Sequence, residues 1–145
     1  METIELKVFN EICRPTEIDK GNWIDLKAMQ DIKLNIGQAE MIPLGVAMKL
    51  PEGYEAHIAP RSSTFKKYGI VQVNSVGVVD NSYSGPNDMW KMPVMKLAEG
   101  TEDMIHAGDR ICQFRIIKSQ PKLNFVDSTL ENNADRGGFG STGIK

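Results

Sequence analysis

The sequence has no hydrophobic run that approaches the ~20 residues of a membrane-spanning helix, so we expect no membrane partner. Its first residues are acidic and alternate between polar and apolar, whereas a signal peptide needs a basic start and a continuous apolar stretch. Cysteine is scarce as well, because Cys13 and Cys112 are the only two and neither belongs to a CxxC motif or a Cys/His cluster. These absences predict a cytoplasmic protein with two free, buried thiols.

A large excess of charge of one sign is also missing. The chain carries 17 Lys and Arg residues against 19 Asp and Glu residues, and its net charge is −2. Proteins whose main ligand is duplex nucleic acid are usually basic, so no stable nucleic-acid partner is expected. A small anionic ligand is compatible with this balance, because it needs only a few local cations.

Several catalytic signatures are absent too. No HExxH or GxSxG motif occurs, and His57 and His106 are isolated, so neither a metalloprotease nor an α/β-hydrolase is supported. Residues Gly138–Gly143 resemble half of a phosphate-binding P-loop, but Ile144 stands where that loop needs lysine. A Walker A motif is therefore rejected.

What the 145 residues do contain is the pattern of one all-β domain, residues 1–145. Apolar residues alternate with polar ones in short runs separated by turns, which is typical of a sandwich, a barrel or a jelly roll. Pro43 indicates an edge strand or a bulge. The predicted strands cover residues 4–8, 32–36, 44–50, 54–58, 70–73, 77–79, 92–97 and 111–117.

One short helix is expected over Thr64–Lys67, with Ser62 or Ser63 as its cap and Gly69 as its stop. Two hydroxyls and backbone N–H groups at a strand-to-helix junction can bind an anion. Arg61 adds forked donors suited to phosphate. The alternative is a plain helix cap without a ligand.

Residues 74–83 hold a second candidate site. Gly77 predicts the bend of a hairpin that lets the backbone approach a flat ligand, and Asn74 has the donor and acceptor that match a pyrimidine edge. Asp80 follows two β-branched residues, and a shielded carboxylate can act as a general base. An ordinary hairpin is the alternative. Gln113, in an otherwise apolar strand, either needs buried partners or faces solvent.

The end of the chain breaks the β pattern. It is rich in glycine, and glycine loses much backbone entropy when it is ordered in a strand interior. The segment 131–145 is therefore either a frayed end or a mobile lid that orders over a ligand. As a lid it offers Arg136 for phosphate, Phe139 for stacking on a base, and the hydroxyls of Ser141 and Thr142.

Five short stretches occur in order between residues 21 and 143, namely Gly21–Leu26, Pro60–Ser63 with Lys67–Ile70, Gly77–Gly85, Gly108–Gln113 and Arg136–Gly143. Each stretch is a weak signal alone. Together they resemble the motifs of the homotrimeric dUTPases, the deoxyuridine triphosphate nucleotidohydrolases. The likeness is to the short enzymes of Gram-positive bacteria and their phages.

The resemblance implies a jelly-roll-like β-barrel with one short helix, as a subunit of a homotrimer with three shared active sites. It implies a dUTP diphosphatase that hydrolyses dUTP to dUMP and pyrophosphate, limiting uracil incorporation into DNA and supplying dUMP for dTTP synthesis. Mg²⁺ would arrive on the triphosphate without a direct protein ligand, and Asp25 and Gln113 would act on it through waters. The glycine-rich tail of one subunit would close the pocket of another.

By the same resemblance, Asp80 orients and deprotonates the water that attacks the α-phosphorus. Asn74 and the backbone near Gly77 read uracil, and Tyr83 lies under the deoxyribose, where a ribose 2′-hydroxyl would clash. The phosphates are held by Arg61, Ser62, Ser63 and Gln113. The tail residues Arg136, Phe139, Gly140, Ser141 and Thr142 complete the substrate site, with Arg136 on the γ-phosphate and Phe139 over uracil.

The chain departs from the family pattern at Trp23-Ile24, before Asp25, and at Pro86–Trp90, after Gly85. Two other functions stay open. A dCTP deaminase of the same core fold would need a catalytic glutamate, and none stands near the hairpin, while the glycine tail favours hydrolysis. A non-catalytic regulatory binding protein of the phage type would use the fold to engage a partner, although no inserted segment offers an extra surface for it.

Overall fold

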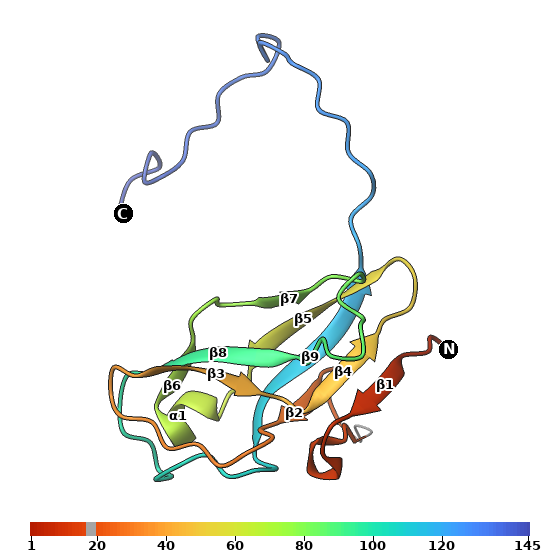
Figure 1. The fold of residues 1–145 in the computed structure, drawn as a ribbon. Helices are drawn as coiled ribbons and strands as arrows, with labels where there is room; N and C mark the ends of the chain where they lie inside the picture. The colour runs from red at the N-terminus through yellow and green to blue at the C-terminus, as the bar shows by residue number, and fades with distance from the viewer. Residues whose placement is uncertain (17–19) are drawn as a thin grey trace.

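The strands of the chain pair into three antiparallel sheets (Figure 1). The structure, a computed structural model, describes residues 1–16 and 20–145. Over these residues it has one α-helix, α1 (Thr64–Tyr68), and one 3-10 helix, η1 (Glu11–Cys13), and no helix is long and apolar enough to cross a membrane. The strands are β1 (Glu5–Val8), β2 (Ile24–Lys27), β3 (Ala39–Pro43), β4 (Val46–Lys49), β5 (Tyr54–Pro60), β6 (Ile70–Gln72), β7 (Gly77–Val79), β8 (Lys91–Lys96) and β9 (Arg110–Lys118).

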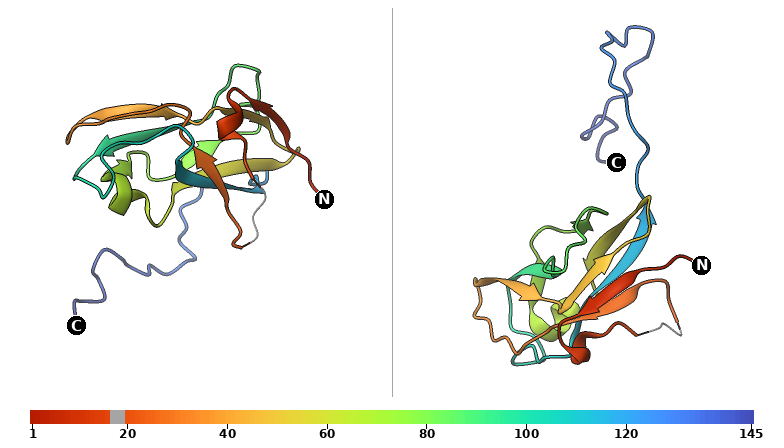
Figure 2. Two further views of the ribbon diagram at one scale, coloured as in Figure 1. Left: turned by 90° about the horizontal axis from the view of Figure 1, so that it is seen from below. Right: turned by 45° about the vertical axis from the view of Figure 1, so that its right-hand side comes forward.

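The largest sheet has the order β2-β9-β5-β7, and two smaller sheets have the orders β3-β8-β6 and β1-β4. Figure 2 shows the three sheets from two further directions. Side chains from all of them meet in one core, where the rings of Trp90 and Phe114 pack edge to face with centroids 5.2 Å apart. The expected all-β, jelly-roll-like fold with a short α-helix is confirmed.

Most predicted strands are present with small shifts of their ends. The run predicted at 44–50 is shorter, because Gly45 has a left-handed φ of 65° and β4 begins after it. A side chain at Gly45 would also meet the Cys13 sulfur, so the close approach favours glycine there. Pro43 ends β3, which is an edge strand of its sheet, as expected.

The strand predicted at 32–36 is wrong. The segment makes one isolated bridge, between Ile32 and Ile105, and then turns, with the Gln38 N–H donating to the Asn35 carbonyl at 2.9 Å. Ile32 and Leu34 are buried by packing on the core without a strand partner. Ile36 is exposed, so the alternation here marked the burial of Ile32 and Leu34 only, and it did not mark strand pairing. Strands β2 and β3 were not predicted as strands.

Helix α1 follows the prediction at its C-terminal end, where Gly69 has a φ of 66° and donates its N–H to the Phe65 carbonyl at 2.8 Å. The predicted serine cap is confirmed in position only. Ser63 occupies the cap position but makes no side-chain cap hydrogen bond. Instead, the Thr64 hydroxyl accepts from the Arg61 N–H at 2.9 Å and donates to the Ile111 carbonyl at 2.8 Å.

The hairpin bend lies two residues earlier in the sequence than predicted. Ser75 has a φ of 57° and lies in the turn between β6 and β7, whereas Gly77 is the first residue of β7. A Cβ at Gly77 would lie 3.0 Å from the Ile58 Cβ of β5. Glycine is therefore needed at this position for close packing of β7 on β5, and the bend itself uses a serine.

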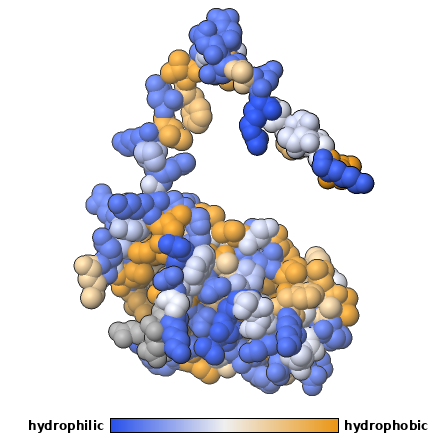
Figure 3. Space-filling view, turned by 180° about the vertical axis from the view of Figure 1, so that it is seen from behind, coloured by the Kyte–Doolittle hydropathy of each residue, from blue (hydrophilic) through white to orange (hydrophobic). Residues whose placement is uncertain are grey.

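We call the described residues before 120 the β body. Beyond β9 the chain leaves this body as an extended arm, residues 120–145 (Figure 1). The Ser119 N–H still donates to the Gly53 carbonyl at 2.9 Å, and every residue after it is exposed. Figure 3 shows orange atoms of the arm standing clear of the body, and its large exposed apolar side chains are Leu123, Phe125, Val126, Leu130, Phe139 and Ile144. The expected lid, residues 131–145, is the outer part of this arm.

Candidate functional site

One group of predicted site residues gathers where β2, β9 and β5 lie side by side. Asp25 is opposite Gln113 in the β2–β9 pair, and Gln113 is opposite Ala59 in the β9–β5 pair. The carboxylate of Asp25 therefore lies beside the segment that follows β5, and its Oδ1 is 2.7 Å from Arg61 Nε. Both side chains are about four-fifths shielded, at 23% and 21% exposed, so solvent screens this ion pair less than one on the open surface.

Two further contacts complete this group. Arg110 Nη1 lies 3.3 Å from Asp25 Oδ2, and Gln113 donates its Nε2–H to the Pro60 carbonyl at 3.0 Å. Gln113 is half-buried and has a partner, which answers the question that its place in an apolar strand raised. Two guanidinium groups against one carboxylate leave one positive charge, and the exposed Ser62 and half-buried Ser63 follow Arg61 directly. This arrangement suits an anionic ligand. We call Asp25, Arg61, Arg110 and Gln113 the Asp25 cluster.

A second set of predicted residues lines a pocket of about 340 Å³ beside β7. Asn74, Gly77 and Tyr83 all contribute to its wall, and the Tyr83 hydroxyl donates to the Met89 carbonyl at 3.1 Å. Its volume is within the range of small-molecule sites. The pocket therefore has the size and the donor–acceptor groups to hold a flat polar ring.

Asp80 comes directly after β7, beyond the last ladder pair between Ala56 and Val79. Its backbone carbonyl accepts the Tyr83 N–H at 3.0 Å in the following turn. The expected shielding of its carboxylate is wrong for the single chain, because Asp80 is exposed. The strand ends at the buried Val79, so no second layer of the same chain covers the next residue.

The two sets do not merge within one chain. None of Asp25, Arg61 and Gln113 lines the pocket beside β7. The predicted tail residues belong to neither set, because Arg136, Phe139, Gly140, Ser141 and Thr142 are all exposed on the arm. The structure thus assembles two parts of the predicted site and leaves the third apart.

Sequence reasoning missed several residues of the pocket. Met41 comes from β3, and Met89, Trp90 and Lys91 come from the end of the 84–90 loop and the start of β8. The indole N–H of Trp90 is buried and has no hydrogen-bond partner. The only signal in the sequence was the departure of Pro86–Trp90 from the family pattern. Arg110 was also missed, although it lies within the recognised stretch Gly108–Gln113.

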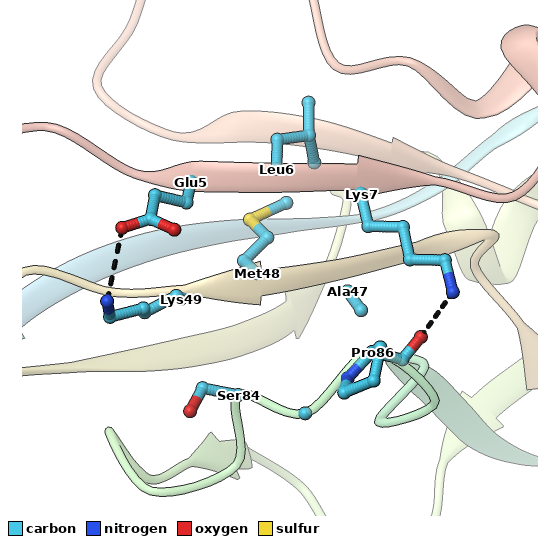
Figure 4. A pocket seen from close by; sticks show the side chains of 9 residues that line it. Glu5, Leu6, Lys7, Ala47, Met48, Lys49, Ser84 and Pro86 are labelled. Atoms are coloured by element: carbon cyan, nitrogen blue, oxygen red, sulfur yellow. Dashed lines mark hydrogen bonds and ion pairs between the residues drawn. The ribbon is translucent and has the colours of Figure 1, made fainter.

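A separate cavity of about 290 Å³ lies between β1, β4 and residues 84–86 (Figure 4). Lys7 reaches across it and donates to the Pro86 carbonyl at 2.6 Å, and Lys49 pairs with Glu5 at 3.1 Å. The Lys7 bond docks the loop of residues 84–90 on the β1–β4 pair, and the Lys49–Glu5 ion pair joins the two strands to each other. The cavity contains none of the predicted substrate residues, so we do not assign the substrate to it.

Metal-binding and thiol chemistry add little to this picture. No group of three or more His, Cys, Asp or Glu side chains among residues 1–16 and 20–145 is arranged to hold a metal ion. Cys13 and Cys112 are free and buried, as predicted. Burial raises the pKa of the Cys112 thiol, and the nearby Asp25 charge raises it further. This thiol is therefore not an activated nucleophile.

The all-β fold, the arginines suited to an anion, the pocket large enough for a flat ring and the exposed carboxylate of Asp80 are together typical of a nucleotide-binding protein. The sequence profile of the dUTPase family matches residues 9–143, and the chain belongs to this family. Its relatives include the SPbeta prophage-derived deoxyuridine 5′-triphosphate nucleotidohydrolase YosS of Bacillus subtilis. That protein is 48% identical over 143 residues, which are 98% of this chain and 99% of the relative.

Solved structures give the same picture of the fold. The dUTPase from Streptococcus mutans is similar with a TM-score of 0.69 and 25% identity, covering 86% of this chain and 98% of that chain. The Staphylococcus bacteriophage 80alpha dUTPase, as a mutant with dUpNHpp, is similar with a TM-score of 0.78 and 22% identity, covering 98% and 99%. The second likeness shows the fold alone. The expected resemblance to phage and Gram-positive proteins is confirmed.

Proposed function

We propose that the protein hydrolyses dUTP to dUMP and pyrophosphate. The observation that carries this proposal is the pocket in which Asn74, Gly77 and Tyr83 meet, with Asp80 at the end of the same strand, in a chain of the dUTPase family. The reaction removes dUTP and forms dUMP. It would thereby limit uracil incorporation into DNA and supply the precursor of dTTP.

The nucleoside would occupy the pocket beside β7. The Asn74 side chain has a carbonyl and an amide that complement the edge of uracil, and the backbone of β7 starts at Gly77 without a side chain in the way. Tyr83 is anchored through its hydroxyl to the Met89 carbonyl. Its ring would pack against the deoxyribose and leave no room for a 2′-hydroxyl.

The triphosphate would bind at the Asp25 cluster. The Arg61 ion pair with Asp25 uses Nε, so the two terminal nitrogens of the guanidinium can donate to phosphate oxygens. The hydroxyls of Ser62 and Ser63, which do not cap the helix, can donate as well. Gln113 is held against the Pro60 carbonyl and would keep its carboxamide directed at the same oxygens.

Mg²⁺ is expected as a component of the substrate complex. When bound to the triphosphate it would neutralise part of the phosphate charge. The residues fit such an ion, because Asp25 and Gln113 are adjacent across the β2–β9 pair and offer the oxygen groups that Mg²⁺ contacts through water.

Asp80 would act as the general base. Its carboxylate takes a proton from a water molecule while the water oxygen bonds to the α-phosphorus. The bond between the α-phosphorus and the oxygen that bridges it to the β-phosphorus breaks, and pyrophosphate leaves with that oxygen. The chain contributes positioning, proton removal and charge, which is what phosphoryl transfer requires.

A homotrimer with shared sites would bring the separate parts together. Support comes from the separation of the pocket and the Asp25 cluster in one chain, and from the arm, whose residues are all exposed in the single chain. Exposed apolar side chains near the pocket, Met41, Val73, Val76 and Val78, also favour coverage by another subunit. In this assembly the tail segment 131–145 of one subunit closes the site of another, with Arg136 on the γ-phosphate and Phe139 over uracil.

The test is a substrate panel with Mg²⁺ and dUTP, UTP, dTTP or dCTP, in which pyrophosphate and ammonia are both measured. We expect rapid pyrophosphate release from dUTP and little from the other nucleotides. Ammonia from dCTP would identify a deaminase instead, and binding without turnover would identify a regulatory protein. Neither alternative is favoured, because no glutamate lines the pocket and the named relatives are nucleotidohydrolases. Sedimentation should give about three times the chain mass of 16.1 kDa.

A further inference from the structure

Arg110 owes its direction to a bulge in β9. Leu26 of β2 is opposite Cys112, but the next residue, Lys27, is opposite Arg110, so Ile111 is an extra residue in β9. Side chains three positions apart on a regular strand point to opposite faces, which would turn Arg110 away from Gln113. The bulge reverses this and brings Arg110 to the face where Asp25 and Gln113 lie.

The bulge gives Asp25 a partner for each of its oxygens. Arg61 Nε lies 2.7 Å from Oδ1, and Arg110 Nη1 lies 3.3 Å from Oδ2. Held at both oxygens, the carboxylate cannot rotate to follow Arg61 alone. Arg110 is 56% exposed and is the outermost of the three charged side chains, whereas Asp25 and Arg61 are shielded.

The residues beside Arg110 contact the helix that follows Arg61. The Ile111 carbonyl accepts the Thr64 hydroxyl at 2.8 Å, and the Asp109 carboxylate accepts the Tyr68 hydroxyl at 2.9 Å. Thr64 and Tyr68 are the first and last residues of α1, the helix that follows Arg61 and the two serines. Segment 109–111 therefore holds both ends of the helix that directly follows Arg61, Ser62 and Ser63.

We propose that Arg110 is a positioning residue of the triphosphate site, which acts through Asp25 to fix the guanidinium of Arg61. It does not itself touch the substrate. This proposal rests on the proposed function, since it assigns the ligand of Arg61 as a phosphate chain. Its effect should fall on phosphate binding, because the general base and the nucleoside pocket lie elsewhere in the chain.

The first test compares Arg110→Gln with wild-type protein. Loss of an exposed ion pair of this kind changes an equilibrium by about 2- to 5-fold, and we expect KM for dUTP to rise by about that factor with kcat unchanged. Arg110→Lys should restore part of the loss, since an ammonium can hold one carboxylate oxygen without the fork of a guanidinium. Arg115→Gln is the matched control: it removes the same charge from the exposed face of β9, where Arg115 lies over the Trp23 ring at 5.8 Å.

The second test asks whether Arg110 acts through Asp25. In an Asp25→Asn background, Arg110→Gln should add no further increase in KM. Additive effects would overturn the proposal, as would an Arg110→Gln variant that matches wild type or the Arg115→Gln control. A melting curve on each variant keeps unfolding separate from misplacement, and the lysine variant serves if the glutamine variant unfolds.

A binding measurement separates this proposal from the proposed function. Calorimetry with Mg²⁺ and inorganic tripolyphosphate probes the Asp25 cluster without a nucleoside. We expect Arg110→Gln to weaken tripolyphosphate binding by the same factor even if wild-type protein fails to hydrolyse dUTP. Equal affinity in the two proteins would overturn the positioning role, whatever the substrate panel gives.

Discussion

In the β body, the Asp25 cluster is held by contacts that already exist within one chain. The arm of residues 120–145 has no described hydrogen bond to the body. Asp25 binds two arginines, and Gln113 is tied to the Pro60 carbonyl. The arm carries Arg136 and Phe139 on exposed chain, and its described hydrogen bonds join residues of the arm to each other. The body is therefore preorganised for a ligand and the arm is not.

The difference has an energetic meaning. Ordering one residue of backbone costs about 1–2 kcal/mol, so contacts with a ligand or a neighbouring subunit must offset the ordering of the arm. Changes in the body should alter the free protein as well as catalysis. Changes in the outer arm should alter catalysis and leave the free protein as stable as before.

The largest effect is expected from Asp80→Asn, which belongs to the body. The amide keeps the shape of the carboxylate but cannot accept the proton of the attacking water, so kcat should fall by about 10²–10⁴-fold. Binding of the unhydrolysable analogue dUpNHpp should persist by calorimetry. Asp103→Asn, at another exposed aspartate outside both sets of site residues, is the matched control. Normal turnover by Asp80→Asn would move the role of base to another residue.

Truncation after Ala134 should have the next largest effect and sharpens the contrast between body and arm. Without Arg136 and Phe139 the triphosphate is held less firmly and water is not excluded, so kcat should fall by about 10- to 100-fold. The melting temperature should not change, because these residues pack on nothing in the free chain. Truncation after Gly143 keeps the predicted lid residues and should keep full activity. A collapse of the melting temperature would show instead that the outer arm is structural.

The smallest effect is expected from Tyr68→Phe, inside the body. The substitution removes the 2.9 Å bond to Asp109 and should lower the free energy of unfolding by about 0.5–1.5 kcal/mol near pH 7. Burial and the bond to Asp109 raise the pKa of Tyr68 above its ordinary value of 10.0. The unfolded chain therefore loses this proton first, and the wild-type advantage should shrink as pH rises above 10.

Urea titrations of both proteins at pH 7 and above pH 10 measure that difference. Tyr54→Phe is the control, because its hydroxyl makes only a long bond of 3.4 Å to an exposed glutamate. A difference between wild type and Tyr68→Phe that is independent of pH would mean that the stabilisation comes from packing and not from the phenol.

Local chemistry in the sequence was enough to predict much of the body. Gly69 ends α1 because a left-handed residue there closes the helix, and a helix stop of this kind can be read without tertiary contacts. Strand β5 follows an alternating run, and β9 follows a mainly apolar run. Residues 32–36 alternate equally well but form no strand, since alternation reports which side chains are buried and not whether a neighbouring strand is available.

The candidate site divides in the same way. The residue types at Arg61, Asn74 and Asp80 raise a phosphate, a pyrimidine edge and a general base as candidate roles, with a plain helix cap and an ordinary hairpin as the alternatives. The register that puts Asp25 opposite Gln113 could not be read from the sequence, because the two residues lie in strands far apart along the chain. Neither could the exposure of Asp80, because it depends on where β7 stops pairing with β5.

The sequence by itself determined the all-β fold class, the single α-helix and, through five ordered stretches, membership of the dUTPase family. These features depend on local periodicity, turn chemistry and residue type, which neighbouring residues carry. Only the tertiary structure decided that a bulge at Ile111 turns Arg110 toward Asp25, and that the hydroxyl of Thr64 ties the start of α1 to the Ile111 carbonyl. Both depend on strand pairing between distant segments, and one residue of register changes the face on which a side chain lies.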